Sequence, residues 1–362
     1  MDLKAYTLEE LEPYLYILYS KPESLVPVSP LRLRSYLSNP RAKMDDPVLF
    51  EMRQDDEVVA YRTLLPDRFY DHKGQPQRFA WLSGNWVRPD KRRQGIATRL
   101  LEMAEEHWQG RLMYTNYAPE SKALYDSTGH FKQIARREGS RFYLRSAAEE
   151  LLGKRMGSRK FLGFTDQLIN QLREKRIQGY KFNSALQCQV NEIDGFLAQL
   201  SELVKRLQQD TLFRRDREIF EWALEYPWVT EQVCDPVNYH FSYKANRFEN
   251  ILLQFTHPVE DSQGIMWIIL HNRVLSVPYF FAGSPALEFC MAESIVRTMI
   301  ASDCTHTTIR NPRLLEHMQA HRKIFFSARN MPQLIFAHKT LEGLLPDKKV
   351  IHDGDGDVMF TG

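Results

Sequence analysis

The sequence contains no apolar run long enough to cross a membrane. Hydrophobic residues make up 43% of its 362 residues, but no uncharged stretch approaches the roughly 20 that a spanning helix needs. Residues 1–6 also lack the apolar region of a signal peptide. We therefore expect a cytoplasmic protein with no membrane partner, long enough for two or three domains.

Cysteine patterns and net charge exclude further classes of protein. No C-x-x-C pair occurs, which disfavours zinc and dithiol chemistry, and we expect buried reduced thiols. With 48 basic and 46 acidic residues the formal net charge is +2, so bulk electrostatics does not indicate a nucleic-acid partner. We expect the basic cluster at 214–217 on a solvated face. The four cysteines are Cys188, Cys234, Cys290 and Cys304.

Metal-binding motifs are also incomplete. Residues 353–357, D-G-D-G-D, resemble the first half of an EF-hand loop, but no late glutamate follows them. None of the eleven histidines belongs to an H-E-x-x-H motif. We expect an exposed glycine-rich turn at 353–357 and no bound metal.

The most informative stretch is R-R-Q-G-I-A at 92–97. It follows the apolar run 81–87 and leads into an amphipathic helix. Gly95 lets the backbone approach a ligand closely, and the first N–H groups of the helix, aided by its dipole, point at an anion. Arg92, Arg93 and Arg99 add positive charge. The turn therefore predicts a pyrophosphate-binding site, although a basic surface turn is the alternative if these six residues are taken alone.

This turn fits neither a kinase-type P-loop nor a Rossmann turn. Its pattern R-x-x-G-x-[GA], carried by Arg92, Gly95 and Ala97, resembles the acyl-CoA motif of the GNAT superfamily of N-acetyltransferases. The resemblance implies that acetyl-CoA is bound as co-substrate by this turn and by the end of the preceding strand. The implied contact residues are Trp86, Val87, Arg88, Arg92, Arg93, Gln94, Gly95, Ile96, Ala97 and Thr98.

A second part of the resemblance lies downstream. Proline and glycine delimit a predicted helix at 119–128, and Tyr125 stands four residues before Gly129, as in the family. The resemblance implies that Tyr125 is the general acid that protonates the departing thiolate; the alternative is a core aromatic. The family's asparagine would fall at Ala118, so Asn116 is the candidate cofactor contact here.

The predicted fold is α/β (α+β), with two GNAT-like units that are each a mixed, largely antiparallel twisted sheet flanked by helices. We place the N-terminal domain at 1–146, a linker at 147–160 and a C-terminal domain at 161–362. Thr7 and Glu10 predict a capping box. Strands at 131–135 and 141–144 would close the first sheet, and strands at 324–328 and 334–338 the second.

The second unit lacks the cofactor motifs. Its strand-to-helix turn, 282–286, has no arginine, and Met318 corresponds in position to Tyr125. We therefore expect one acyl-CoA per chain. A degenerate copy commonly shapes the acceptor site or an oligomer interface in this superfamily, so a homo-oligomer stays open.

The function expected is transfer of an acetyl group from acetyl-CoA to a primary amine on a small molecule or peptide. The general base stays open, because the strand before the turn offers Ser83 and Asn85 where relatives carry a carboxylate. A water chain, a carboxylate from elsewhere or a neutral acceptor would serve. Two alternatives are a non-catalytic acyl-CoA sensor and an aminoacyl transferase of the cell-wall peptide type, which does not need this motif.

Overall fold

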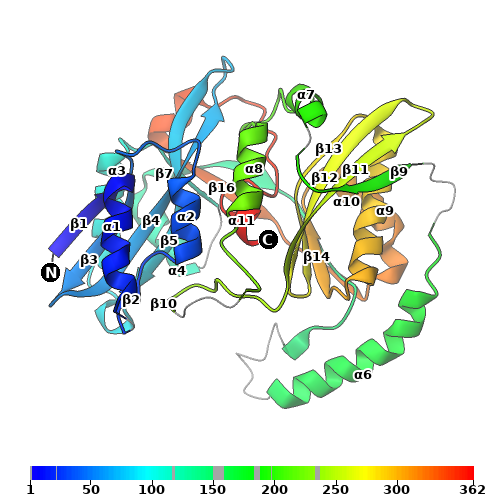
Figure 1. Ribbon diagram of the computed structural model, residues 1–362, viewed down its shortest axis with the longest axis horizontal. Coiled ribbons are helices and arrows are strands. Elements are labelled where there is room, and N and C mark those ends of the chain that lie inside the picture. Colours follow the sequence, from blue (N-terminus) through cyan, green and yellow to red (C-terminus); the bar gives the residue numbers. More distant parts are fainter. Residues whose placement is uncertain are drawn as a thin grey trace. The chain divides into compact units, whose positions relative to one another are not determined.

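A computed structural model shows a chain that divides into two compact units (Figure 1). It describes residues 2–21, 23–115, 119–149, 159–182, 188–196, 198–232 and 237–362. The first unit consists of 1–136, 208–245 and 334–361, and the second of 137–207, 246–333 and 362. Two later segments of the chain thus belong to the first unit. These compact units do not follow the expected division at 147–160.

The first unit is built on a seven-stranded sheet with the order β1-β3-β4-β5-β6-β16-β7. The β5–β6 pair is parallel, whereas β1–β3, β3–β4, β4–β5 and β6–β16 are antiparallel. A short parallel pair joins β2 to β10. The strands are β1 (Asp2–Thr7), β2 (Leu25–Val26), β3 (Pro47–Gln54), β4 (Glu57–Tyr70), β5 (Pro76–Val87), β6 (Leu112–Thr115), β7 (Phe131–Arg137), β10 (Asn238–Tyr239) and β16 (Gln333–His338).

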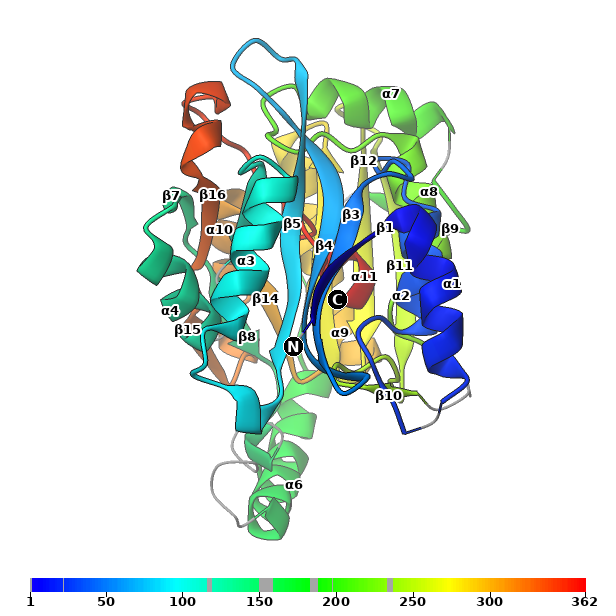
Figure 2. The ribbon, with the colours of Figure 1, turned by 90° about the vertical axis from the view of Figure 1, so that its left-hand side faces the viewer.

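Local signals explain where the helices of this unit begin. The predicted capping box at Thr7 and Glu10 is confirmed, and four leucines form the buried stripe of the helix that it starts. Figure 2 shows α1 and α2 on one side of strands β1, β3, β4 and β5, and α3 on the other. The helices are α1 (Leu8–Tyr19), α2 (Pro30–Leu37), α3 (Ile96–His107), α4 (Pro119–Thr128), α8 (Arg217–Glu225) and α11 (Val358–Thr361).

The second unit has its own seven-stranded sheet, with the order β15-β8-β14-β13-β12-β11-β9. Only β13–β14 pairs in parallel among the strand pairs that the structure describes here. The strands are β8 (Ser140–Tyr143), β9 (Gln189–Ile193), β11 (Phe248–His257), β12 (Ser262–His271), β13 (Val274–Ala282), β14 (His306–Ile309) and β15 (Ser327–Asn330). Two mixed, largely antiparallel sheets flanked by helices confirm the predicted fold class.

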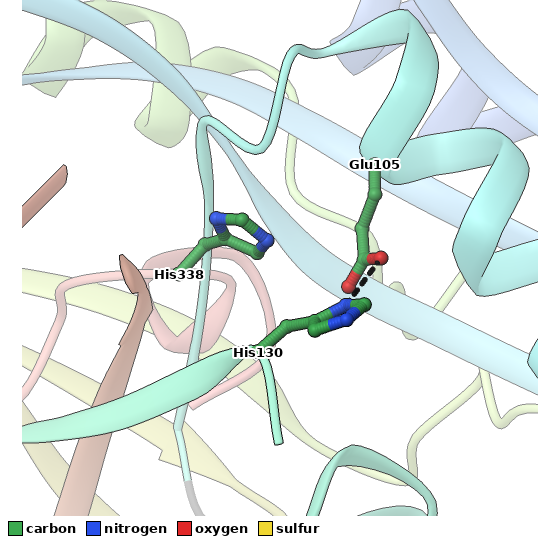
Figure 3. A group of neighbouring side chains, drawn as sticks. All are labelled: Glu105, His130 and His338. Atoms are coloured by element: carbon green, nitrogen blue, oxygen red, sulfur yellow. Dashed lines mark hydrogen bonds and ion pairs between the residues drawn. The ribbon is translucent and has the colours of Figure 1, made fainter. Parts of the chain in front are cut away.

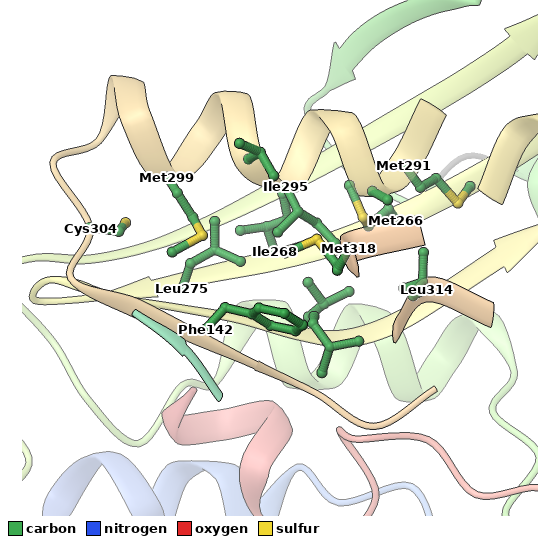
Figure 4. Close-up of a cluster of buried hydrophobic side chains, with 14 of the residues drawn as sticks. Phe142, Met266, Ile268, Leu275, Met291, Ile295, Met299, Cys304, Leu314 and Met318 are labelled. Carbon is green, nitrogen blue, oxygen red and sulfur yellow. The ribbon is translucent and has the colours of Figure 1, made fainter. Parts of the chain in front are cut away.

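One apolar cluster fills the second unit (Figure 4). Helix α9 (Pro285–Ala301) contributes Met291, Ile295 and Met299 to it, facing Met266 and Ile268 on β12. Burial of such side chains is the main favourable term in folding. The remaining helices of the unit are α6 (Arg159–Gln178), α7 (Ala198–Leu207) and α10 (Pro312–Ala320).

Two strands belong to a different sheet from the one that the sequence predicts. The strand expected to close the first sheet, β8, pairs instead with β14 and β15 in the second. The strand expected to end the second sheet, β16, pairs with β6 in the first. An apolar run predicts a strand but carries no information about its partner, so the assignment to sheets was wrong at these two positions while the strands themselves were right.

A buried ionic cluster corrects two further expectations. Arg215 donates to both carboxylate oxygens of Asp67, at 2.7 and 2.9 Å, and to Oδ1 of Asp355, at 3.1 and 3.0 Å. All three side chains are buried. Residues 214–217 are therefore not simply a solvated face, and 353–357 is not simply an exposed turn, because long-range ion pairing overrides what each stretch indicates locally.

The expectation of reduced thiols is also wrong for one pair. Cys188 and Cys290 form a disulfide between Cα atoms 6.5 Å apart, across 102 positions in the sequence. Cys304 is a buried free thiol, and Cys234 lies outside the described residues. Disulfides are more typical of oxidising compartments, so this pair does not support the expected cytoplasmic location.

Among the described residues, no helix is both long and apolar enough to span a membrane.

Candidate active site

The predicted cofactor turn joins β5 to α3 in the first unit. A 3₁₀ turn, Pro89–Lys91, leads to Gly95, which is the N-cap of α3 with φ +74°. No side chain caps this helix, and a Cβ atom placed on Gly95 would meet no atom within 4 Å. The space beside the first turn of α3 is therefore open, and the glycine is required for its left-handed backbone rather than by contacts within the protein.

The arginines of the turn differ in their partners. Arg92 donates from Nε to the carbonyl oxygen of Val87 at 3.2 Å. Arg88 is held by Glu57 and Asp90, at 2.9 and 2.8 Å. Arg92 and Arg93 are exposed, so they can turn toward an anion, whereas the charge of Arg88 is already compensated. Of the three, Arg92 and Arg93 are therefore the more available to an anion.

Strands β5 and β6, which precede and follow the turn and α3, pair over only two residues each. The β5–β6 pairing consists of Ala80 with Leu112 and Trp81 with Met113. Strand β5 continues to Val87 and β6 to Thr115, and no further pair joins their described residues. The β6-facing edge of β5 from Leu82 onward therefore has backbone groups outside this ladder. Backbone N–H and C=O groups at such an edge can bind an extended ligand as a strand would.

Tyr125 on α4 is buried next to a buried arginine. Its hydroxyl oxygen accepts a hydrogen bond from Nη1 of Arg62 at 3.0 Å, and both side chains are almost fully buried. Nε and Nη2 of Arg62 have no hydrogen-bond partner. Arg62 lies on β4, opposite Asn85 of β5. The structure thus places a cation against the phenol, a contact that sequence spacing could not indicate.

Other unpartnered polar atoms occur on the same strands and on β6. Their hydrogen-bonding capacity stays available to a ligand, because a buried polar group without a partner is costly. Burial raises the pKa of Tyr61 and of Tyr114. The ring of Tyr114 contacts that of Tyr125, with centroids 4.1 Å apart and the planes tilted by 36°. The atoms are the hydroxyl oxygens of Tyr61 and Tyr114 and Oδ1 of Asn85.

A carboxylate reaches the position at which the sequence offers none. The hydroxyl of Ser83 on β5 donates to Oδ2 of Asp357 at 2.8 Å. The same hydroxyl accepts from Nη2 of Arg32 at 2.9 Å. Asp357 lies 274 positions further along the chain, just before α11. Of the alternatives left open for the general base, this contact favours a carboxylate from elsewhere in the chain.

The structure describes most of the predicted site residues and adds two that the sequence does not indicate. Trp86, Val87 and Arg88 lie at the end of β5, and the turn and first helical residues continue from them as expected. Asn116 lies outside the described residues. Arg62 and Asp357 were not singled out from the sequence. No local motif marks them, since their importance depends on contacts across 63 and 274 positions.

Comparison with known proteins identifies the family of one segment of the first unit. Residues 11–130 match the acetyltransferase (GNAT) family. This part of the chain is a GNAT acetyltransferase domain, and acyl transfer from acyl-CoA is the general activity that the family indicates. No curated protein matches the chain significantly.

Solved structures resemble the chain in fold over most of its length. N-myristoyltransferase of Saccharomyces cerevisiae, with bound myristoyl-CoA, has a TM-score of 0.51 at 11% identity, with 99% of this chain and 83% of that chain covered. A conserved protein of unknown function from Enterococcus faecalis V583 has a TM-score of 0.53 at 9% identity, with coverages of 94% and 73%. At such identities the likeness shows the fold alone.

Proposed function

We propose that this protein is an acyl-CoA-dependent N-acyltransferase, with acetyl-CoA as donor and a primary amine as acceptor. The contact between Arg62 and Tyr125 carries the proposal, because it equips the predicted general acid for proton transfer at a buried site. The family match supports the donor class.

The first unit has the features that a pyrophosphate and an extended pantetheine arm require. Open space at Gly95, the uncapped first turn of α3, and exposed Arg92 and Arg93 suit the pyrophosphate. The edge of β5 from Leu82 to Val87 suits the arm. Bound acyl-CoA would supply the thioester, and the protein would supply an acid and a base.

Tyr125 would donate its phenolic proton to the leaving sulfur. Proton donation leaves a phenolate, and the Arg62 guanidinium at 3.0 Å stabilises that negative charge. Burial strengthens this interaction, because there is little water to screen it. The neighbouring Tyr114 lacks such a partner: burial raises its pKa, and no hydrogen-bond donor contacts its hydroxyl.

Asp357 would accept the proton of the incoming ammonium group. An amine must be neutral to attack a carbonyl, so a nearby base is needed unless the acceptor arrives neutral. Asp357 is positioned by Ser83 at the point where β5 leaves β6. Arg32 fixes the other side of that hydroxyl. The carboxylate therefore belongs to the same strand region as the proposed donor site.

The test is release of CoA from acetyl-CoA across a panel of amines, polyamines, aminoglycosides, amino acids and peptides. With an accepted amine, Tyr125→Phe should lower kcat by about 10²–10⁴-fold and leave acetyl-CoA affinity nearly unchanged. Tyr114→Phe is the matched control, because it removes a neighbouring buried phenol that lacks a partner. Equal losses in both variants would return Tyr125 to a packing role.

Two further variants test the partners. Arg62→Met should lower kcat because the phenolate loses its cation, and Asp357→Asn should lower kcat most for amines of high pKa. If the protein binds acetyl-CoA but releases no CoA with any amine, the non-catalytic acyl-CoA sensor is favoured. If the protein transfers an aminoacyl group from aminoacyl-tRNA and no acetyl group from acetyl-CoA, the aminoacyl transferase of the cell-wall peptide type is favoured.

A further inference from the structure

Three side chains from different elements of the first unit converge outside the proposed acyl-transfer site. They are Glu105 in the last turn of α3, His130 between α4 and β7, and His338 at the end of β16. One ligand atom from each lies within 4.8 Å of the other two. Figure 3 shows the three side chains pointing toward one another. We propose that this cluster binds a divalent transition-metal ion, with zinc as the ion best suited to it.

The chemistry of the donors favours zinc over hard cations. Two imidazoles and one carboxylate are common zinc ligands, whereas calcium and magnesium prefer oxygen ligands alone. Zn–N and Zn–O distances of about 2.0–2.2 Å place tetrahedral ligand atoms roughly 3.3–3.5 Å apart. Small side-chain rotations would close 4.8 Å to that spacing. Three protein ligands leave the fourth position to water.

The carboxylate is directed into the cluster. Oε2 of Glu105 lies 2.9 Å from Nδ1 of His130. Its second oxygen, Oε1, is buried and has no hydrogen-bond partner. A metal ion bound to Oε2 in place of the proton between Glu105 and His130 would also place positive charge close to this buried oxygen. An ordinary surface ion pair would leave it unpaired, at a cost in free energy.

The backbone around His338 orients its ring. Nδ1 of His338 accepts a hydrogen bond from the backbone N–H of Thr340 at 3.3 Å and lies 3.0 Å from the Thr340 hydroxyl oxygen, which donates to the carbonyl oxygen of Gly110 at 2.9 Å. In the neutral metal-free ring the proton is therefore on Nε2, and metal binding through Nε2 would move the ring proton to Nδ1, which would then donate to the Thr340 hydroxyl oxygen. Donation from the second ring nitrogen to a protein oxygen is typical of metal-binding histidines.

A glycine provides the space for this ring. A Cβ atom on Gly110 would lie 2.6 Å from the ring of His338, so Gly110 permits the close approach. The ring centroids of His130 and His338 are 5.7 Å apart. The metal would join the end of α3, the α4–β7 connection and β16. Its role would be structural, and the proposal does not depend on acyl transfer.

This inference departs from the sequence-based expectation that no metal is bound. That expectation considered only local motifs, and His338 lies far from the other two ligands in sequence. The sequence shows only isolated histidines. The strand order β6-β16-β7 places β16, which ends at His338, beside β7, which begins directly after His130.

The experiment is titration of the metal-free full-length protein with Zn²⁺, followed by calorimetry and by the melting temperature. We expect one saturable site per chain and a melting temperature that rises with zinc concentration. Glu105→Gln, His130→Gln and His338→Gln should each weaken binding at least about 10-fold. His72→Gln, which changes an exposed histidine of the same unit, should not.

Thr340→Val provides a second measurement that does not remove a ligand. Loss of its hydroxyl should weaken zinc binding by about 10–100-fold through misorientation of His338. Cobalt substitution should give the visible absorption of a tetrahedral site in the wild type, and this band should be lost in His338→Gln. Absence of a saturable site, or a site unchanged in all three ligand variants, would overturn the proposal.

Discussion

Replacement of Gly95 by valine separates the needs of the ligand from the needs of the fold. Gly95 has φ +74°, and a Cβ atom there meets no protein atom within 4 Å. A side chain would therefore cost only the strain of a left-handed backbone, about 1–2 kcal/mol for an ordinary residue and somewhat more for a β-branched one. Domains are stable by about 5–15 kcal/mol, so Gly95→Val should fold.

The same side chain would occupy the space assigned to the pyrophosphate. We expect acetyl-CoA affinity to fall by about 100-fold or more, since the phosphates could no longer reach the N–H groups of the helix. The measurement is calorimetry on protein whose circular dichroism is unchanged. Gly74 supplies a matched control, because its φ is +73° and its nearest neighbour to a Cβ is the end of the Arg214 side chain at 3.9 Å. Gly74→Val carries the same strain in the turn between β4 and β5.

Comparison of Gly95→Val with Gly74→Val tests whether acetyl-CoA binds at the start of α3. Similar losses of melting temperature, with acetyl-CoA binding lost only in Gly95→Val, would place the ligand at the start of α3. Equal affinities in the two variants would refute the argument that Gly95 is kept for close approach, and with it the acyl-CoA site.

Three other outcomes are expected. Arg92→Glu should weaken acetyl-CoA binding, with a larger loss at low salt if the contact is electrostatic; a salt-independent loss would contradict this. Titration should give one acetyl-CoA per chain. In the corresponding turn of the second unit, a Cβ on Gly283 would lie 2.7 Å from the carbonyl oxygen of Gln263, so there is no open space beside this glycine. A second saturable site that survives Gly95→Val would disprove this prediction. Burial, and to a lesser extent the nearby charge of Arg141, lowers the pKa of His306 from 6.5 to about 4. As pH falls, His306 is therefore protonated in the unfolded chain before it is protonated in the folded one, and roughly 3 kcal/mol of stability should be lost between pH 6.5 and pH 4. Urea midpoints that fall equally in His306→Gln would refute this.

Local pattern was sufficient for most elements of the fold. Helix 119–128 has the predicted bounds, since a proline at its start and a glycine after its end delimit it. The sequence does not predict helix α8, because the basic cluster 214–217 that leads into it is typical of a solvated face. Its N-cap, Asp216, accepts from the backbone N–H of Ile219, a signal that the arginine run 214–217 obscured.

The site was predictable only where its chemistry is local. The turn around Gly95 and the spacing of Tyr125 to Gly129 are visible in a short window of sequence. Arg62, Asp357 and the partner of Cys188 are not, because each depends on which distant segments fold together. No residue type or spacing distinguishes Asp357 from its neighbouring aspartates. Only the hydrogen bond to Ser83 does.

The division of the first unit among three segments has a consequence for how it can be made and dissected. A fragment cut at residue 146 would keep Asp67 but lose Arg215 and Asp355, and a buried carboxylate without its cation is strongly destabilising. It would also lose β16, the strand that lies between β6 and β7 in its sheet. The first unit is thus not separable from the rest of the chain by a cut at this position. Its assembly must wait for contacts between residues far apart in sequence, and such topologies fold slowly.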